Sequence, residues 1–172
     1  EYLDSLEMTA TIKDFEPLYI QRIAQLTNKS NQFNLTTLRC SEDDIRAMAA
    51  DADALCLCGK LVDKFGDNGI VTVVAGKRQG DLLDLTLWLM SCRVLKRGME
   101  DAMMDTLMAQ AAAAGVKTVV GHYYPTAKNA MVRDFYAQFG FAKTAEDAEG
   151  NTEWRLEVSG YEPKHPHMKI ER

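Results

Sequence analysis

The first fifty residues carry one strand pattern followed by two helical patterns. Residues 6–13 partly alternate between apolar and polar positions, which predicts a strand. Asp14 can cap a following helix, whose apolar positions recur at helical spacing: Tyr19, Ile20, Ile23 and Leu26. A polar stretch at 28–34 predicts a loop. Residues 41–50 begin with Ser-Glu-Asp-Asp, which is typical of a capping box and predicts a second, short helix.

The middle of the chain predicts three consecutive strands, at residues 54–63, 69–78 and 81–91. The sequences between them, Gly-Asp-Asn-Gly at 66–69 and Gln-Gly at 79–80, are typical of hairpin turns. Hairpin turns join antiparallel neighbours, so we expect an antiparallel meander. Alternation along the third strand predicts that four leucines share one face: Leu83, Leu85, Leu87 and Leu89.

The last third of the chain alternates between helix and strand. A long helix is predicted over 98–113, because apolar residues recur on one of its faces: Met99, Met103 and Leu107. The elements predicted after it are a strand at 118–124, a helix at 127–139 and two weaker strands at 141–147 and 152–158. Residues 160–172 are expected to form a tail. The whole order predicts an α+β (α/β) sandwich with one central sheet, as a single domain over residues 1–159.

Composition narrows the class of protein. The chain has 172 residues, 47% of them hydrophobic, and a formal net charge of −5, which is typical of a globular domain and argues against nucleic acid as the main partner. No apolar run approaches the roughly 20 residues needed to span a membrane, and no signal peptide is visible. The four cysteines lack metal-site or redox spacing, so we expect no metal and a cytoplasmic location. The chain begins with Glu1 rather than Met, which indicates a piece of a longer protein.

A basic joint lies between the third meander strand and the long helix. It reads Cys92-Arg93-Val94-Leu95-Lys96-Arg97-Gly98-Met99. The first amides of a helix are free and its dipole is positive at that end, so such a joint favours an anion. Arg93, Lys96 and Arg97 beside Gly98 therefore predict a phosphate-binding site.

This joint and the order of elements resemble the GCN5-related N-acetyltransferases (GNATs), in the segment Arg97-Gly98-Met99-Glu100-Asp101-Ala102. Those enzymes carry Arg/Gln-x-x-Gly-x-Gly/Ala at the start of this helix and bind the pyrophosphate of acetyl-CoA on its amides. The resemblance implies the GNAT-like acyl-CoA N-acyltransferase fold, with a central, mostly antiparallel mixed sheet flanked by helices. It also implies that Ala102 and the residues of the joint bind the cofactor. Glu100 stands where the family has Gly: pointing into the loop it opposes a phosphate, and pointing outward it leaves the basic residues free.

A downstream segment extends the same resemblance. Asn129 and residues 136–141 (Tyr-Ala-Gln-Phe-Gly-Phe) are similar to the family's Asn…Tyr-x-x-x-Gly-Phe segment. The resemblance implies that Asn129 contacts the cofactor arm and that Tyr136 protonates the leaving thiolate, a role that suits a phenol.

Four longer strings, at residues 25–37, 63–69, 88–100 and 123–129, resemble the C-terminal region of FkbH-like proteins, and the likeness covers about residues 15–145. Members of that family join a haloacid dehalogenase-type phosphatase domain to an acetyltransferase-like domain. They are associated with dephosphorylating bisphosphoglycerate and loading the glyceryl group onto an acyl carrier protein. The implied partners are an acyl carrier protein or CoA thioester, bound through phosphopantetheine or acetyl-CoA, and an N-terminal phosphatase domain whose Asp-x-Asp-x-Thr/Val motif this sequence lacks.

Four further polar residues are candidates for substrate binding or acid–base chemistry. Asn31 and Asn34 lie in the loop after the first helix, where the resemblance implies the acceptor substrate; the alternative is a solvated turn. Asp84, in the third meander strand, is either a general base that faces a cleft or an ordinary surface acid. His122, at a strand end, is either an acid–base residue or a structural, hydrogen-bonded histidine.

Three functions compete at this point. The first is the acyltransferase-like domain of an FkbH-like protein, binding a phosphopantetheine arm during glyceryl or acyl transfer to a carrier protein. The second is an acetyl-CoA-dependent N-acetyltransferase with a small-molecule or protein amine as acceptor. The third is a non-catalytic interaction domain that keeps the fold and has lost the CoA loop.

Overall fold

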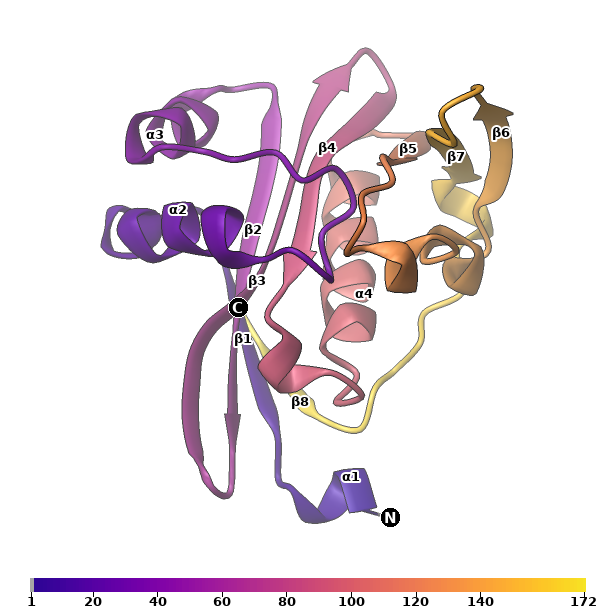
Figure 1. The fold of residues 1–172 in the computed structure, drawn as a ribbon. Coiled ribbons are helices and arrows are strands. Elements are labelled where there is room, and N and C mark those ends of the chain that lie inside the picture. Colours follow the sequence, from indigo (N-terminus) through magenta and orange to yellow (C-terminus); the bar gives the residue numbers. More distant parts are fainter. Residues whose placement is uncertain (1) are drawn as a thin grey trace.

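One eight-stranded sheet with helices on both faces organises residues 2–172, the part of the chain that the computed structural model describes (Figure 1). The α-helices and strands are, in chain order, α1 (Tyr2–Ser5), β1 (Thr9–Lys13), α2 (Ile20–Lys29), α3 (Glu42–Ala50), β2 (Ala54–Asp63), β3 (Gly66–Gln79), β4 (Leu82–Met90), α4 (Met99–Ala113), β5 (Thr118–Tyr123), β6 (Ala142–Glu146), β7 (Thr152–Glu157) and β8 (Lys169–Glu171). Short 3₁₀ helices are η1 (Pro17–Tyr19), η2 (Cys92–Val94), η3 (Ala130–Val132), η4 (Tyr136–Phe139) and η5 (Val158–Gly160). None of the helices in these described residues is both long and apolar enough to cross a membrane.

The strand order is β6-β7-β5-β4-β3-β2-β1-β8. Strands β2, β3 and β4 form the predicted antiparallel meander, and parallel pairing is confined to β4 with β5 and β1 with β8. The prediction of a mostly antiparallel mixed sheet is therefore confirmed. The segment 160–172, expected as a tail, contributes β8, which pairs with β1 through Thr9–Thr11 at the edge of the sheet.

Helices α2 and α3 cover one face of the sheet, and α4 covers the other (Figure 1). The predicted capping box begins α3: the Ser41 side chain accepts from the Asp44 amide at 3.1 Å, and the Asp44 carboxylate accepts from the Ser41 amide at 2.9 Å. The apolar stripe of α4 is buried as its spacing predicts, at positions that include Met99, Met103 and Leu107. The sheet thus separates two apolar cores, one under α4 and one under α2 and α3.

A bulge corrects the expectation that the four leucines of β4 share one face. Leu83 and Leu85 pack in the α4 core, whereas Leu87 and Leu89 pack in the core under α2 and α3. The pairing register with β3 shifts between Leu85 and Leu87, so that Thr86 is the extra residue. One additional residue reverses the side-chain alternation of everything after it.

Two other boundaries differ from the sequence prediction. The helix expected over 127–139 is replaced by the 3₁₀ turns η3 and η4, because the aromatic residues of this segment pack as a cluster on Trp88 instead of along one helical face. Met131, expected on the apolar stripe, is half exposed as a result. The strand expected from residue 6 begins at Thr9, after the short helix α1.

Gly121 on β5 is the position where the Tyr136 ring rests on the sheet. A Cβ at Gly121 would lie 2.3 Å from the ring carbon Cζ, closer than packed atoms approach. We expect Gly121→Ala to lower the free energy of unfolding by about 3 kcal/mol, because the ring or the strand must move. Gly160→Ala is the matched control, since nothing lies within 4 Å of its added methyl group, and its effect should stay within about 0.5 kcal/mol. Urea denaturation measures both; equal losses would contradict the close packing of Tyr136 on β5.

Candidate functional site

A fork between β4 and β5 is the site's framework. The two parallel strands pair over only three positions, Leu82–Asp84 with Thr118–Val120. They then separate, although β4 continues to Met90 and β5 to Tyr123. A strand edge without a neighbour strand has N–H and C=O groups that need other partners. The fork is therefore a place where either a ligand or another part of the chain must complete the sheet.

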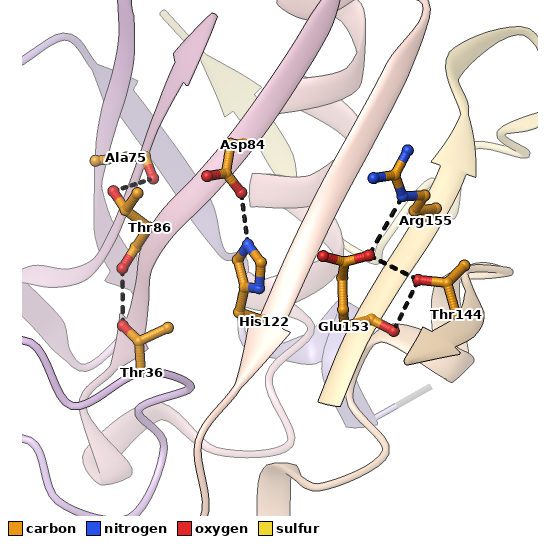
Figure 2. A network of polar contacts seen from close by, with 8 residues as sticks. All are labelled: Thr36, Ala75, Asp84, Thr86, His122, Thr144, Glu153 and Arg155. Atoms are coloured by element: carbon orange, nitrogen blue, oxygen red, sulfur yellow. Dashed lines mark hydrogen bonds and ion pairs between the residues drawn. The ribbon is translucent and has the colours of Figure 1, made fainter. Parts of the chain in front are cut away.

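Asp84 and His122 meet at the point where the fork begins. Asp84 Oδ1 lies 2.6 Å from His122 Nε2, and the two side chains are 30% and 19% exposed (Figure 2). Leu83 and Leu85 point to the α4 core, so Asp84 between them lies on the opposite face of the sheet. A carboxylate at one imidazole nitrogen fixes the ring and leaves Nδ1 for a second proton partner. The structure thus brings together two of the predicted catalytic residues.

The surroundings of this pair are polar. The Tyr124 ring lies 6.0 Å from the His122 ring, and Thr36 donates to the Thr86 carbonyl at 2.8 Å on the other side of Asp84. Farther across the sheet, Glu153 accepts from Thr144 at 3.0 Å (Figure 2). Beyond the area that α2 and α3 cover, the sheet therefore presents a partly open polar face around Asp84 and His122.

Residues 33–36 of the chain occupy the fork itself. The Leu35 amide donates to the Trp88 carbonyl at 3.0 Å, and the Met90 amide donates to the Phe33 carbonyl at 2.9 Å. On the β5 side the Tyr124 amide donates to the Leu35 carbonyl at 2.9 Å. This segment, which we call the insert, thereby pairs with both separated strands and completes the sheet between them.

Asn129 holds the insert in place. Its amide nitrogen donates to the Asn34 carbonyl at 2.9 Å and to the Tyr124 carbonyl at 3.0 Å, and its oxygen accepts from the Thr126 amide at 2.8 Å. The side chain is fully buried. Asn34, predicted to contact substrate, is also fully buried, and it bonds the Ser30 carbonyl and the Thr37 amide. Both asparagines therefore bind the chain's own backbone.

Tyr136, the third predicted catalytic residue, lies in the α4 core, apart from the Asp84–His122 contact. Its side chain is only 1% exposed, and the rings of Trp88, Phe135 and Phe141 surround it. Burial, with a smaller contribution from the charge of Asp84, raises the pKa of its phenol far above the ordinary value. No hydrogen bond joins it to Asp84 or His122 in this structure.

The basic joint does not form one cluster. Arg97 Nη1 lies 2.7 Å from Asp63 Oδ2, and this hydrogen bond lowers the pKa of the Asp63 carboxyl. Arg93 and Lys96 are exposed and Cys92 is too. The remaining predicted cofactor-binding residues of the joint are buried in the core: Val94, Met99 and Ala102. Only Arg93 and Lys96 thus remain as cations of the joint without a carboxylate partner.

The backbone shifts the position of the phosphate-loop motif. Lys96 has φ 64° and Gly98 has φ 85°, so both adopt the left-handed conformation that favours glycine. They stand two residues apart, as do the two Gly positions of Arg/Gln-x-x-Gly-x-Gly/Ala, and Arg93 stands three residues before Lys96. The geometry favours Arg93–Gly98 as the motif over residues 97–102, with Lys96 in place of the first Gly.

The start of α4 is acidic and partly covered. Glu100 is half-buried, and its carboxylate accepts from its own backbone N–H. It thereby bonds one of the free amides at the start of α4. The C-terminal segment passes over the same end: Pro166 and Met168 lie 3.3 and 3.6 Å from where a Gly98 Cβ would stand. Asp105 anchors that segment by accepting from the Tyr161 hydroxyl at 2.5 Å.

These contacts decide whether a CoA arm fits the fork. An extended arm would have to pair with the β4 edge at Thr86–Met90, where the insert already makes the backbone bonds. Arg97 is committed to Asp63, and Glu100 lies two residues beyond Gly98, where the motif ends as the backbone favours it. In this structure the insert therefore occupies the β4 edge that an arm lying in the fork would use, while Arg93 and Lys96 remain without a carboxylate partner at the joint.

Glu100 makes stability depend on pH. Burial, then the neighbouring charge of Asp101, raises the pKa of its carboxyl to about 7. The folded chain then holds this proton more tightly than the unfolded chain, so stability falls as pH rises from about 4.5 to 7. We expect Glu100→Gln to unfold with about 1–3 kcal/mol more free energy than the parent at pH 8, and with the same free energy near pH 4.

Urea denaturation at the two pH values measures this difference. Glu162→Gln, at an exposed position, removes the same charge and is the matched control. A gain at pH 8 that is no larger than that of the control would show that Glu100 is not destabilised by burial.

The fold has many counterparts among solved structures, although no protein-family model and no curated protein matches the sequence. The ribosomal-protein-S18-alanine N-acetyltransferase from Escherichia coli aligns with TM-score 0.65 at 14% identity, over 87% of this chain and 94% of that one. Spermidine N-acetyltransferase from Vibrio cholerae, solved with CoA and spermine, aligns with TM-score 0.64 at 10% identity, over 87% and 96%. An acetyltransferase of the GNAT family from Staphylococcus aureus aligns with TM-score 0.64 at 9% identity, over 87% and 99%. These likenesses, together with the β4–β5 fork, show that the chain has the fold of the GNAT acetyltransferases.

Proposed function

We propose that this chain is an acyltransferase-like domain that supports acyl or glyceryl transfer at a thioester, with Asp84 and His122 as the residues that move the proton. The observation that carries the proposal is the 2.6 Å contact between their side chains at the start of the fork, on the partly open face. A His–carboxylate pair at such a place can serve as a base for an acceptor thiol or amine.

The chemistry requires one proton to leave the acceptor and one to reach the leaving group. With Asp84 holding Nε2, Nδ1 of neutral His122 takes the proton of the acceptor as the acceptor atom bonds to the acyl carbon. The carbon–sulfur bond then breaks, and the imidazolium returns the proton to the thiolate. The Asp84 side chain, in contact with Nε2, stabilises the imidazolium between the two transfers.

The carrier-protein form of the proposal rests on the resemblance to FkbH-like proteins and on charge. Acyl carrier proteins are acidic, and Arg93 and Lys96 are exposed cations on a chain whose formal net charge is −5. We further propose that the natural partner of this domain is a haloacid dehalogenase-type phosphatase domain of the same protein. In this form the thioester arm approaches over the open face of the sheet and does not enter the fork.

A CoA-dependent N-acetyltransferase is the second candidate. Lys96 and Gly98 adopt the left-handed conformations of a phosphate loop, which favours it. It would require the insert to leave the β4 edge and the Glu100 carboxyl to be protonated or displaced. Tight acetyl-CoA binding with acetylation of an amine would support this candidate over carrier-protein transfer.

The role of the pair is tested by His122→Gln and Asp84→Asn. The chain is mixed with an acyl-loaded carrier protein and an acceptor thiol, and intact-mass spectrometry follows loss of the acyl group. Loss of a proton-transfer residue should slow the reaction by about 100-fold in each variant. His167→Gln is the control, because His167 is exposed and pairs with Asp4 far from the fork. Unchanged rates in both variants would contradict the role of the pair, and no turnover by the parent would leave the interaction domain as the function.

A further inference from the structure

An open pocket of about 650 Å³ lies where the end of α2 approaches the end of β4. Residues 29–32 form one wall, and residues 90–93, from the end of β4 into η2, form another. Its size falls within the range of small-ligand sites.

Four cations line this pocket and no carboxylate does: Arg22, Lys29, Arg93 and Lys128. None of the four forms an ion pair with any described residue. A concave, single-sign cluster of this kind concentrates the electric field inside the pocket. It is unexpected on a chain with five more acidic than basic residues.

Arg22 shows that the cations act on one another. Its side chain is half-buried on α2, and burial, then the charge of Arg93, lowers the pKa of its guanidinium. Two like charges near one another repel. An anion between them would relieve this repulsion.

The rest of the lining suits an organic anion. Asn31, Gln32 and Ser91 offer hydrogen-bonding groups, and Leu26 and Met90 provide an apolar surface. Asn31 and Lys128 also line a second pocket of about 370 Å³ that contains Thr126. Because they share Asn31 and Lys128, the two pockets adjoin, and the second one reaches Thr126.

We propose that this pocket binds a phosphate ester, with Arg22 and Arg93 on the phosphate and the organic part directed toward Thr126. Arginine forks match phosphate oxygens in pairs, and a doubly charged group offsets more of the cluster than a carboxylate does. The inference deepens the proposed function, because it places the charged end of a thioester arm outside the fork. Binding is measured without turnover, so the two proposals can fail separately.

Calorimetry with 4′-phosphopantetheine, pantetheine, glycerol phosphate and inorganic phosphate tests the proposal. 4′-Phosphopantetheine should bind at least about tenfold more tightly than pantetheine, and its affinity should fall as salt rises. Glycerol phosphate separates the two sources of the ligand: affinity equal to that of 4′-phosphopantetheine indicates a small phosphorylated metabolite, and weaker affinity indicates the carrier arm. Pantetheine binding as tightly as its phosphate ester would overturn the proposal.

Variants locate the site. Arg22→Ala and Arg93→Ala should each weaken 4′-phosphopantetheine by about tenfold, since each removes a charge-assisted contact. Lys77→Ala, whose side chain pairs with Asp51 away from the pocket, is the control and should leave the affinity unchanged. Arg93 also donates to Ser91 Oγ and to the Asn68 carbonyl, so urea denaturation of each variant checks that a loss of binding does not come from unfolding. Unchanged affinity in both arginine variants would place the phosphate elsewhere and overturn the proposal.

Discussion

The need to pair the edge of β4 beyond Asp84 governs the functional half of this molecule. Two parallel strands that separate leave backbone N–H and C=O groups inside the sheet, and unpaired buried groups of this kind are costly. The insert, residues 33–36, resolves this by bonding β4 at Trp88 and Met90 and β5 at Tyr124. Asn129 then fixes the insert by donating from its side-chain amide to the Asn34 carbonyl.

This internal pairing determines which polar groups of the sheet stay accessible. With the fork filled, the α4 side of the sheet is a continuous apolar core that contains Tyr136, and the accessible polar groups lie on the other face. Asp84 and His122 sit there at the start of the fork, and the cationic pocket lies beside the end of the same strand.

The bulge at Thr86 connects these features. It reverses the side-chain alternation of β4, so Asp84 faces the open side while Trp88, two residues beyond Thr86, packs in the α4 core. Without it, the acid and the apolar residues of this strand could not each reach their side of the sheet.

Local patterns predicted much of this fold. Turn residues identified the meander, the capping box identified α3, and the Met and Leu spacing identified α4. The resemblance to the GNATs led to the fold, whereas Asp84 and His122 were separate candidates chosen from their positions in the predicted strands. What local patterns missed depends on contacts between distant residues: Arg97 with Asp63, Asn129 with Asn34, and β8 with β1.

The cationic pocket was missed for the same reason, since its members come from α2, η2 and the loop after β5. One local signal was present, because Arg22 and Lys29 stand seven residues apart and so share a face of α2. The positive φ of Lys96 could not be predicted from a lysine, and it gives Arg93–Gly98 the spacing that the resemblance implied for residues 97–102. The bulge at Thr86 likewise could not be predicted, because the leucines of β4 alternate without interruption in the sequence.

Hydrogen exchange of the backbone amides of Leu35, Met90 and Tyr124 tests the central claim, that the chain itself fills the fork. If the insert is a stable part of the sheet, these three amides exchange as slowly as those of the meander strands, and excess acetyl-CoA leaves their rates unchanged. Fast exchange of all three, or a change in their rates when acetyl-CoA is added, would show that the fork is open to the cofactor and would contradict the account.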